Sequence, residues 1–125
     1  MHLSSNVQLS NAHFSISGRK DHNQDSVGFG LPTENVQITK GSCGVIADGV
    51  SSAEAGAEAA QLCVSEFIKD YFDTPDIWTV KKSAQKVLSS INRTLYSRSN
   101  EYLDSRGWIC TFSAIVIKSH TAHLF

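Results

Sequence analysis

The sequence lacks an apolar run long enough to span a bilayer, and its first ten residues lack the basic start and apolar centre of a signal peptide. It also lacks an excess of either charge, since 11 Lys and Arg residues nearly balance 12 Asp and Glu residues. A balanced charge argues against the basic surface on which nucleic-acid binding depends. We therefore expect a cytoplasmic protein, a single small domain in length, with no nucleic-acid partner and no membrane contact.

Cysteine is scarce as well. Cys43, Cys63 and Cys110 are an odd number at unrelated spacings, and each lies within an apolar segment. This distribution is typical of reduced, buried thiols that act as small hydrophobic residues. It argues against a zinc site, which requires closely spaced Cys or His ligands along the chain.

The strands are predicted from alternating polar and apolar residues. In the first part of the chain they are expected at 7–16, 27–31, 37–40 and 43–47. The strongest strand is 109–117, which is largely apolar on both faces and is therefore expected to be central and covered on both sides. Residues 118–120 then turn the chain into a further strand that contains Ala122 and Leu124.

Two helices are predicted between these groups of strands. The first begins near Ser51 or Ser52, because Ser51 and Glu54 have the spacing of a capping box, and it ends before Pro75. Its small residues allow close approach to a neighbouring element. Its apolar stripe comprises Ala60, Cys63, Val64, Phe67 and Tyr71. The second helix carries apolar residues at helical spacing, namely Val80, Ala84, Val87, Leu88, Ile91 and Leu95.

Two carboxylates have positions that packing does not explain. Asp48 directly follows the apolar segment 44–47, where an unpaired charge costs several kcal/mol of desolvation unless it binds a partner or a metal. Asp25 follows a polar turn and begins another predicted strand. If the two strands are neighbours, both carboxylates converge at one end of a sheet. Oxygen ligands without nearby Cys or His favour Mg²⁺ or Mn²⁺.

Neighbouring residues extend this predicted metal site. The carbonyl of Gly49 is available for coordination if the backbone turns there, and Gln24 offers a side-chain oxygen for a metal or its water. Arg19 and Lys20 are candidates for binding phosphate oxygens. Two ions ~4 Å apart would acidify a bridging water and neutralise an attacked phosphate. Alternatively, Asp-Gly forms an ordinary turn, Asp25 caps a turn, and the two basic residues are solvated surface charges.

Four motifs follow one another along the chain: Asn-Gln-Asp-Ser at 23–26, Ile-Ala-Asp-Gly-Val at 46–50, a small-residue helix around Gly56, and Thr-Phe-Ser-Ala at 111–114. In this order they resemble the metal-dependent protein phosphatases of the type 2C, or PPM, family. The resemblance implies an α+β fold, a four-layer α-β-β-α sandwich, of which residues 1–125 are the N-terminal portion, truncated inside a strand. It also implies hydrolysis of phosphoserine or phosphothreonine in proteins, by a water bound between two Mg²⁺ or Mn²⁺ ions.

The resemblance implies a role for each candidate residue. Asp48 matches the carboxylate that bridges the two metals, and Gly49 matches the residue whose carbonyl binds one of them. Asp25 matches an acidic residue that binds metal directly or through water. Lys20 stands where the family usually has the Arg that binds the substrate phosphate, and Arg19, one position away, is a candidate substitute for that Arg.

The sequence also departs from the family pattern. Gln24 stands where the family usually has Glu, which removes one negative charge from the metal site, and Ser51-Ser52 replace a usual Gly pair. The family's later Asp-containing motifs are absent from these residues, so we expect the isolated chain to have little or no phosphatase activity.

Further residues, including Trp78 and the tail 121–125, resemble a narrower group in which the phosphatase domain opens a longer bacterial chain that continues into a protein kinase domain. Two alternatives to catalysis stay open. One is a non-catalytic phosphatase-like interaction module. The other is a regulatory domain that restrains the kinase of the same chain.

Overall fold

The computed structural model describes residues 7–50, 52–53, 55–100 and 107–125. Their helices and strands are, in chain order, β1 Asp25–Gly30, α1 Glu34–Lys40, β2 Ser42–Gly49, α2 Gly56–Asp73, α3 Val80–Asn100, β3 Cys110–Lys118 and β4 Thr121–Leu124. The strands form one antiparallel sheet in the order β1-β2-β3-β4. An antiparallel sheet with its helices segregated from it is an α+β arrangement, as predicted.

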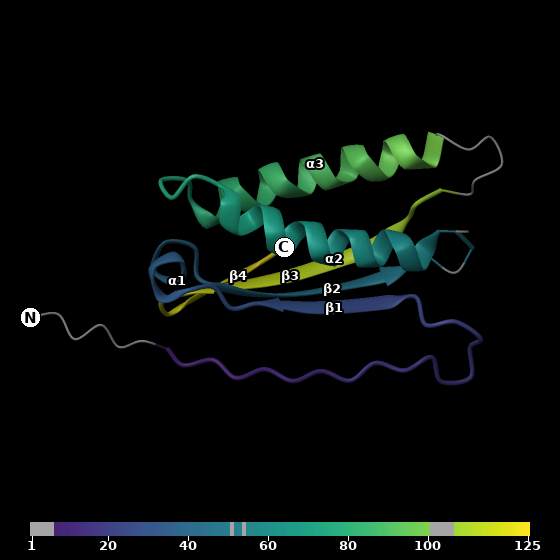
Figure 1. Ribbon diagram of the computed structural model, residues 1–125, viewed down its shortest axis with the longest axis horizontal. Coiled ribbons are helices and arrows are strands. Elements are labelled where there is room, and N and C mark those ends of the chain that lie inside the picture. Colours follow the sequence, from purple (N-terminus) through teal and green to yellow (C-terminus); the bar gives the residue numbers. More distant parts are fainter. Residues whose placement is uncertain (1–6, 51, 54, 101–106) are drawn as a thin grey trace, which may run out of the picture.

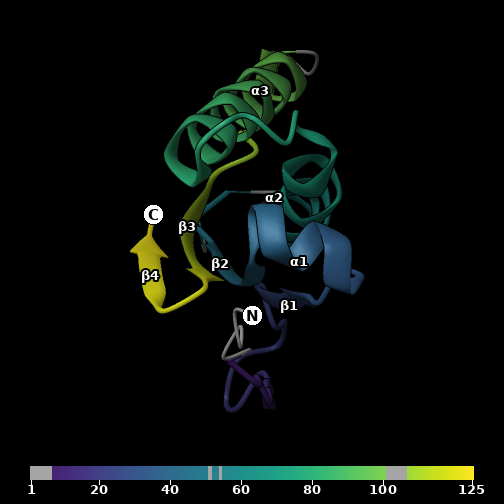
Figure 2. The same cartoon turned by 90° about the vertical axis from the view of Figure 1, so that its left-hand side faces the viewer.

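The two long helices lie on the same side of the sheet. Helix α2 covers the sheet directly, and α3 packs on α2 further out (Figures 1 and 2). The segment that precedes β1 runs as extended chain along the opposite side (Figures 1 and 2). Among the described residues, no helix combines the length and the apolar character that crossing a bilayer requires.

The core lies between the sheet and α2, and the helical periodicity predicted it well. Every residue of the predicted stripe of the first helix is buried. On the second helix the predicted residues are buried or pack against the core at partial burial. From the sheet, the core receives Cys43, Val45, Ala47, Ala114 and Val116.

Small residues allow α2 to approach the sheet closely. A Cβ at Gly30 would overlap the ring of Phe72 and lie 2.9 Å from the Cys43 Sγ. A Cβ at Gly49 would overlap the backbone of Gly56, at the first turn of α2. Both ends of the helix are therefore fixed against the sheet by positions that accept no side chain.

The predicted strand at 7–16 does not form. This segment is extended but pairs with no strand, and Phe14 is 86 % exposed. Alternating polarity favours a strand only where a neighbouring backbone accepts the ladder hydrogen bonds, and here the sheet begins at β1.

The predicted strand at 37–40 is wrong as well, because these residues are the last turns of α1. The Gln37 N–H donates to the Thr33 carbonyl at 2.9 Å, which closes a helical turn. Gly41 adopts a φ of 77° and ends the helix, with its N–H donating to the Gln37 carbonyl at 2.8 Å. The alternation of polar and apolar residues at 37–40 is too short to specify a strand. Gly41 instead terminates a seven-residue helix at this point.

The positions of β1, β2, β3 and β4 agree with the strands predicted at 27–31, at 43–47, at 109–117 and around Ala122 and Leu124. Strand β3 lies between β2 and β4, and Ser119, with a φ of 54°, turns the chain into β4. However, the buried residues of β3, Ala114 and Val116, lie only on its helix-facing side. Ile115 and Ile117 on the other side are half-buried, so the expectation of cover on both sides is wrong for the described residues.

The start of the first helix also differs from the prediction. Helix α2 begins at Gly56, and its N-cap residue Ala55 makes no side-chain capping hydrogen bond. The capping box predicted at Ser51 and Glu54 falls outside the described residues.

A buried lysine fastens α1 to the connection between α2 and α3. Lys40 is 0 % exposed, and its ammonium donates to the carbonyls of Pro75 at 2.6 Å and Trp78 at 3.3 Å, and to the Ser83 Oγ at 2.8 Å. The Tyr71 hydroxyl donates to the Lys40 carbonyl at 2.7 Å. Burial lowers the pKa of Lys40, but three acceptors keep the ammonium hydrogen-bonded.

Replacing this lysine tests the network. Lys40→Met keeps most of the side-chain volume but removes the donor to three acceptors, so the free energy of unfolding should fall by about 2 to 4 kcal/mol. Urea denaturation measures the change. Lys69→Met, at an exposed position of α2, is the matched control and should change little. Equal urea midpoints for the two variants would contradict the structural role of Lys40.

Candidate active site

Asp25 and Asp48 are direct partners in the ladder between β1 and β2. Partners in an antiparallel ladder project from the same face of the sheet, with their Cβ atoms about 5 Å apart. The neighbouring Ala47 is buried toward α2, so the two carboxylates project from the face opposite the helices. The structure thus brings together the two residues on which the predicted metal site depends.

Both side chains are exposed, which corrects one step of the sequence argument. Asp48 was expected to incur a desolvation cost because it follows a buried strand. The alternation of the strand instead buries Ala47 and turns Asp48 toward solvent. Asp48 therefore does not carry the full desolvation cost of a buried charge, and its closest charged neighbour is the Asp25 carboxylate.

The proximity of Asp48 affects the acidity of Asp25. Its pKa is raised, chiefly by a side-chain hydrogen bond with Asp48, then by desolvation and by the charge of Asp48. The Lys20 ammonium acts in the opposite direction. A hydrogen bond between two carboxyl groups requires that they share a proton. A bound cation would take the place of that proton.

Hydrogen bonds hold the start of β1 against the end of β2. The Asn23 Oδ1 accepts from the Asp25 N–H at 3.0 Å, and its Nδ2 donates to the Ser15 Oγ at 2.8 Å. The Gln24 carbonyl accepts from the Gly49 N–H at 2.9 Å. Asn23 thus positions Asp25, a role that the sequence analysis missed. The signal for it is that an Asn side chain commonly accepts a hydrogen bond from the backbone N–H two residues further on, which forms a turn.

Gly49 and Gln24 meet at the first turn of α2. Gly49 does not have a positive φ, so the backbone conformation does not require glycine at this position. Glycine is required because a Cβ would overlap the backbone of Gly56. The Gln24 side-chain nitrogen also lies beside Gly56, 3.0 Å from where a Cβ would be. The packing role of Gly49 is therefore established, while metal binding by Gly49 and Gln24 stays a prediction.

Thr111 extends the carboxylate pair across a third strand. It is the ladder partner of Asp48 on β3, it is exposed, and its Oγ1 lies 3.4 Å from the Asp48 carbonyl, to which it donates. Asp25, Asp48 and Thr111 therefore form a row of oxygen-bearing side chains. Thr111 lies in one of the four sequence motifs, but only the register between β2 and β3 shows that it is next to Asp48.

The two basic candidates lie in the exposed turn before β1. Lys20 donates its backbone N–H to the Ser17 carbonyl at 3.2 Å, and its ammonium is close enough to act on the charge of Asp25. Arg19 is exposed in the same turn. Phosphate binding by either residue stays a prediction.

The donor set suits a hard cation but is small. Within the part of the chain that the structure describes, no group of three or more His, Cys, Asp or Glu side chains is placed to hold a metal. Two carboxylates with nearby carbonyl and hydroxyl oxygens match the ligands of Mg²⁺ and Mn²⁺, which commonly keep several waters. The residues present therefore fit part of a coordination sphere.

Comparison with known proteins supports the fold. No protein-family model matches the sequence, and no curated protein matches it. Among solved structures, a crystal structure of a mutant bacterial serine phosphatase is similar, with a TM-score of 0.63 and 21 % sequence identity over 86 % of this chain. The match covers 50 % of the phosphatase, so the chain spans about half of its length. The described residues thus share a phosphatase-like fold.

The carboxylate pair predicts a measurable titration. Asp25 should titrate above its ordinary pKa in NMR, and Asp48→Asn should lower that pKa because an amide cannot share a carboxyl proton with Asp25 and does not repel its charge. A raised carboxyl pKa means that the folded state binds the proton more tightly. The free energy of unfolding should therefore fall as the pH rises through the window between the ordinary and raised values, and less so in Asp48→Asn.

The control for this titration is Asp21→Asn, an exposed carboxylate in the turn that carries Lys20. It should leave the Asp25 titration nearly unchanged. An Asp25 pKa that is the same in the wild type and in Asp48→Asn would show that the two carboxyl groups do not interact.

Proposed function

We propose that this chain is the N-terminal part of a metal-dependent serine/threonine protein phosphatase domain of the type 2C kind. The single observation that carries the proposal is the register that sets Asp25 opposite Asp48. The similarity of the fold to a bacterial serine phosphatase supports it. The proposed reaction is hydrolysis of phosphoserine or phosphothreonine in a phosphorylated protein.

The proposed mechanism assigns the chain's residues as follows. Asp48 and Asp25 would hold the Mg²⁺ or Mn²⁺ ions, two in the complete domain, with the Gly49 carbonyl and Gln24 as further ligands. The bound metals supply an acidified water and charge neutralisation for the phosphate. Lys20, assisted by Arg19, would orient the phosphate oxygens from the adjacent turn. A bound cation would offset the charge that Asp25 and Asp48 bring together at this end of the sheet.

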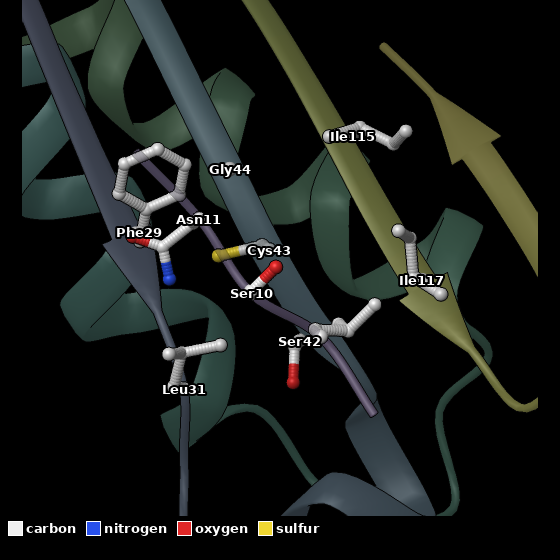
Figure 3. A pocket seen from close by; sticks show the side chains of 10 residues that line it. Ser10, Asn11, Phe29, Leu31, Ser42, Cys43, Gly44, Ile115 and Ile117 are labelled. Carbon is white, nitrogen blue, oxygen red and sulfur yellow. The ribbon is translucent and has the colours of Figure 1, made fainter. Parts of the chain in front are cut away.

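The outer face of the sheet supports a larger fold. This face carries apolar side chains over all four strands, and Ile46 and Leu124 are 56 % and 77 % exposed. A cavity of about 110 Å³ opens there between residues 9–11 and the sheet, lined by Phe29, Ile117 and others (Figure 3). The Ser42 Oγ is buried at this cavity without a hydrogen-bond partner among the described residues.

An apolar sheet face of this kind is usually covered by a second layer. We assign that layer to the second sheet of a four-layer α-β-β-α sandwich, formed by residues that follow Phe125 in a longer chain. The same residues would supply the remaining metal ligands. On this assignment residues 1–125 are a domain portion with an incomplete metal site. The resemblance carried by Trp78 and the tail 121–125 extends the proposal to a cytoplasmic bacterial parent that continues into a kinase domain.

A non-catalytic role is the second candidate, favoured by one observation. Only two of the described acidic side chains converge at the site, and Gln24 contributes no charge to it. A domain of this type would bind a phosphoprotein or restrain a kinase without hydrolysing phosphate.

Substitution of Asp48 separates the two candidates. In a chain extended to the complete domain, Asp48→Asn should lower Mn²⁺-dependent phosphate release from a phosphopeptide by at least about 100-fold, because metal contributes several kcal/mol to catalysis. Lys69→Met, at an exposed position on α2, is the control and should retain activity. Phosphate binding without turnover in the wild type would support the interaction module and contradict the enzyme.

A separate prediction concerns the activity of the isolated residues 1–125. Residues 1–125 should not hydrolyse p-nitrophenyl phosphate in the presence of Mn²⁺, because the described residues supply too few ligands for two ions. The release of p-nitrophenol, measured by absorbance, checks this. Turnover that is lost in Asp48→Asn would show that the site is complete without further residues.

A further inference from the structure

Two of the three cysteines meet in the core although 47 residues separate them in the sequence. Cys63 lies on α2 and Cys110 is the first residue of β3. Their Sγ atoms are 3.3 Å apart, within thiol hydrogen-bond distance. Cys63 is buried, whereas Cys110 is half-buried. No sequence pattern predicts this pair, because the spacing of the two residues along the chain is unrelated to their contact.

The separation of the two sulfur atoms allows a disulfide after a small movement. An S–S bond is about 2.0 Å long, so the two sulfur atoms would have to approach by roughly 1.3 Å. Cys110 stands at the end of its strand, where a small backbone shift breaks fewer ladder bonds than it would at the centre. A link between α2 and β3 would also close a long loop of the unfolded chain, which is a stabilising constraint.

The two thiols differ in reactivity. Burial and the hydrogen bond with Cys110 raise the pKa of Cys63 to about 12, so Cys63 remains a protonated thiol at neutral pH. The half-buried Cys110 is the partner that an oxidant can reach. Cys43 provides a comparison within the same chain. It is buried, its pKa is raised to about 11 by burial, and it lies beside Gly30 rather than at the Cys63–Cys110 contact.

We propose that Cys63 and Cys110 form a reversible disulfide when the protein meets a peroxide. The Cys110 thiolate attacks one peroxide oxygen, the O–O bond breaks, and a sulfenic acid and hydroxide result. The Cys63 sulfur then attacks the Cys110 sulfur, the S–O bond breaks, and the departing hydroxide takes the Cys63 proton. In total two thiols and one hydrogen peroxide give one disulfide and two waters.

The disulfide would act on the carboxylate site through the β2–β3 ladder. Cys110 is the ladder partner of Gly49, and Thr111 is the partner of Asp48. The Val50 N–H also donates to the Ile109 carbonyl at 3.0 Å. Movement of Cys110 toward α2 therefore displaces the strand that fixes Asp48 and Gly49. This second step rests on the proposed function, and it predicts weaker Mn²⁺ binding in the oxidised form.

Peptide mapping of the full 125-residue chain tests the disulfide. The protein is treated with hydrogen peroxide, its remaining thiols are alkylated, and it is cleaved without reduction by a glutamyl endopeptidase. Cleavage at Glu54 and Glu58 separates Cys43 from Cys63, which a tryptic digest would leave on one peptide. We expect a cross-linked pair of peptides that contain Cys63 and Cys110, lighter by two hydrogens than their sum, which dithiothreitol separates.

Two cysteine variants serve as controls for the peptide mapping. Cys43→Ala should still form the cross-link, and Cys110→Ser should abolish it. The proposal is overturned if peroxide leaves Cys63 and Cys110 open to alkylation, converts Cys110 to a sulfinic acid without a cross-link, or links Cys43 instead.

Mn²⁺ titration of the reduced and oxidised wild type tests the coupling to the site. A severalfold higher dissociation constant after oxidation is expected, and Cys110→Ser should show no such change. A disulfide without any change in affinity would overturn the coupling alone. Absence of Mn²⁺ binding in both forms would count against the proposed function and leave the mapped disulfide standing.

Discussion

The site depends on one constraint, the register that makes two carboxylates ladder partners at the end of β1 and β2. Like charges directly opposite one another destabilise a sheet, so this arrangement would be disfavoured if the strands were free to shift. They are not free, because a slip by one residue would turn Val45 and Ala47 out of the core. Burial of the apolar residues of β2 therefore holds Asp48 opposite Asp25 despite the repulsion.

Helix α2 reinforces this register from the other face. Its first turn contacts the backbone of Gly49, and its far end fills the space that Gly30 leaves empty. Asn23 and the Gln24 carbonyl tie the loop before β1 to the same point. The carboxylate pair is thus positioned by core packing, by backbone contact and by hydrogen bonds, which is the kind of support that a preorganised ion site needs.

The sequence predicted those parts of the fold that carry long periodic patterns. The stripes of α2 and α3 extend over several turns, so the correct face followed from spacing alone. The segment 7–16 failed because alternation does not reveal whether a partner strand exists, and 37–40 failed because a local glycine stop decided a short segment. The sequence correctly predicted Asp48 near the end of a strand. Its exposure depends on which residues of β2 face the core, and only the folded sheet shows this. Thr111 and the contact between Cys63 and Cys110 depend on tertiary register, which no local pattern encodes.

The central claim is that the pair of Asp25 and Asp48 attracts a divalent cation. Paramagnetic broadening by substoichiometric Mn²⁺ in the amide NMR spectrum of residues 1–125 tests it most directly, because the effect marks the residues nearest the ion. The account predicts that the signals of Asp25, Asp48 and Thr111 broaden first and that Asp48→Asn removes the effect. Broadening that begins instead at the exposed acidic end of α2, around Asp73, or that persists unchanged in Asp48→Asn, would contradict it.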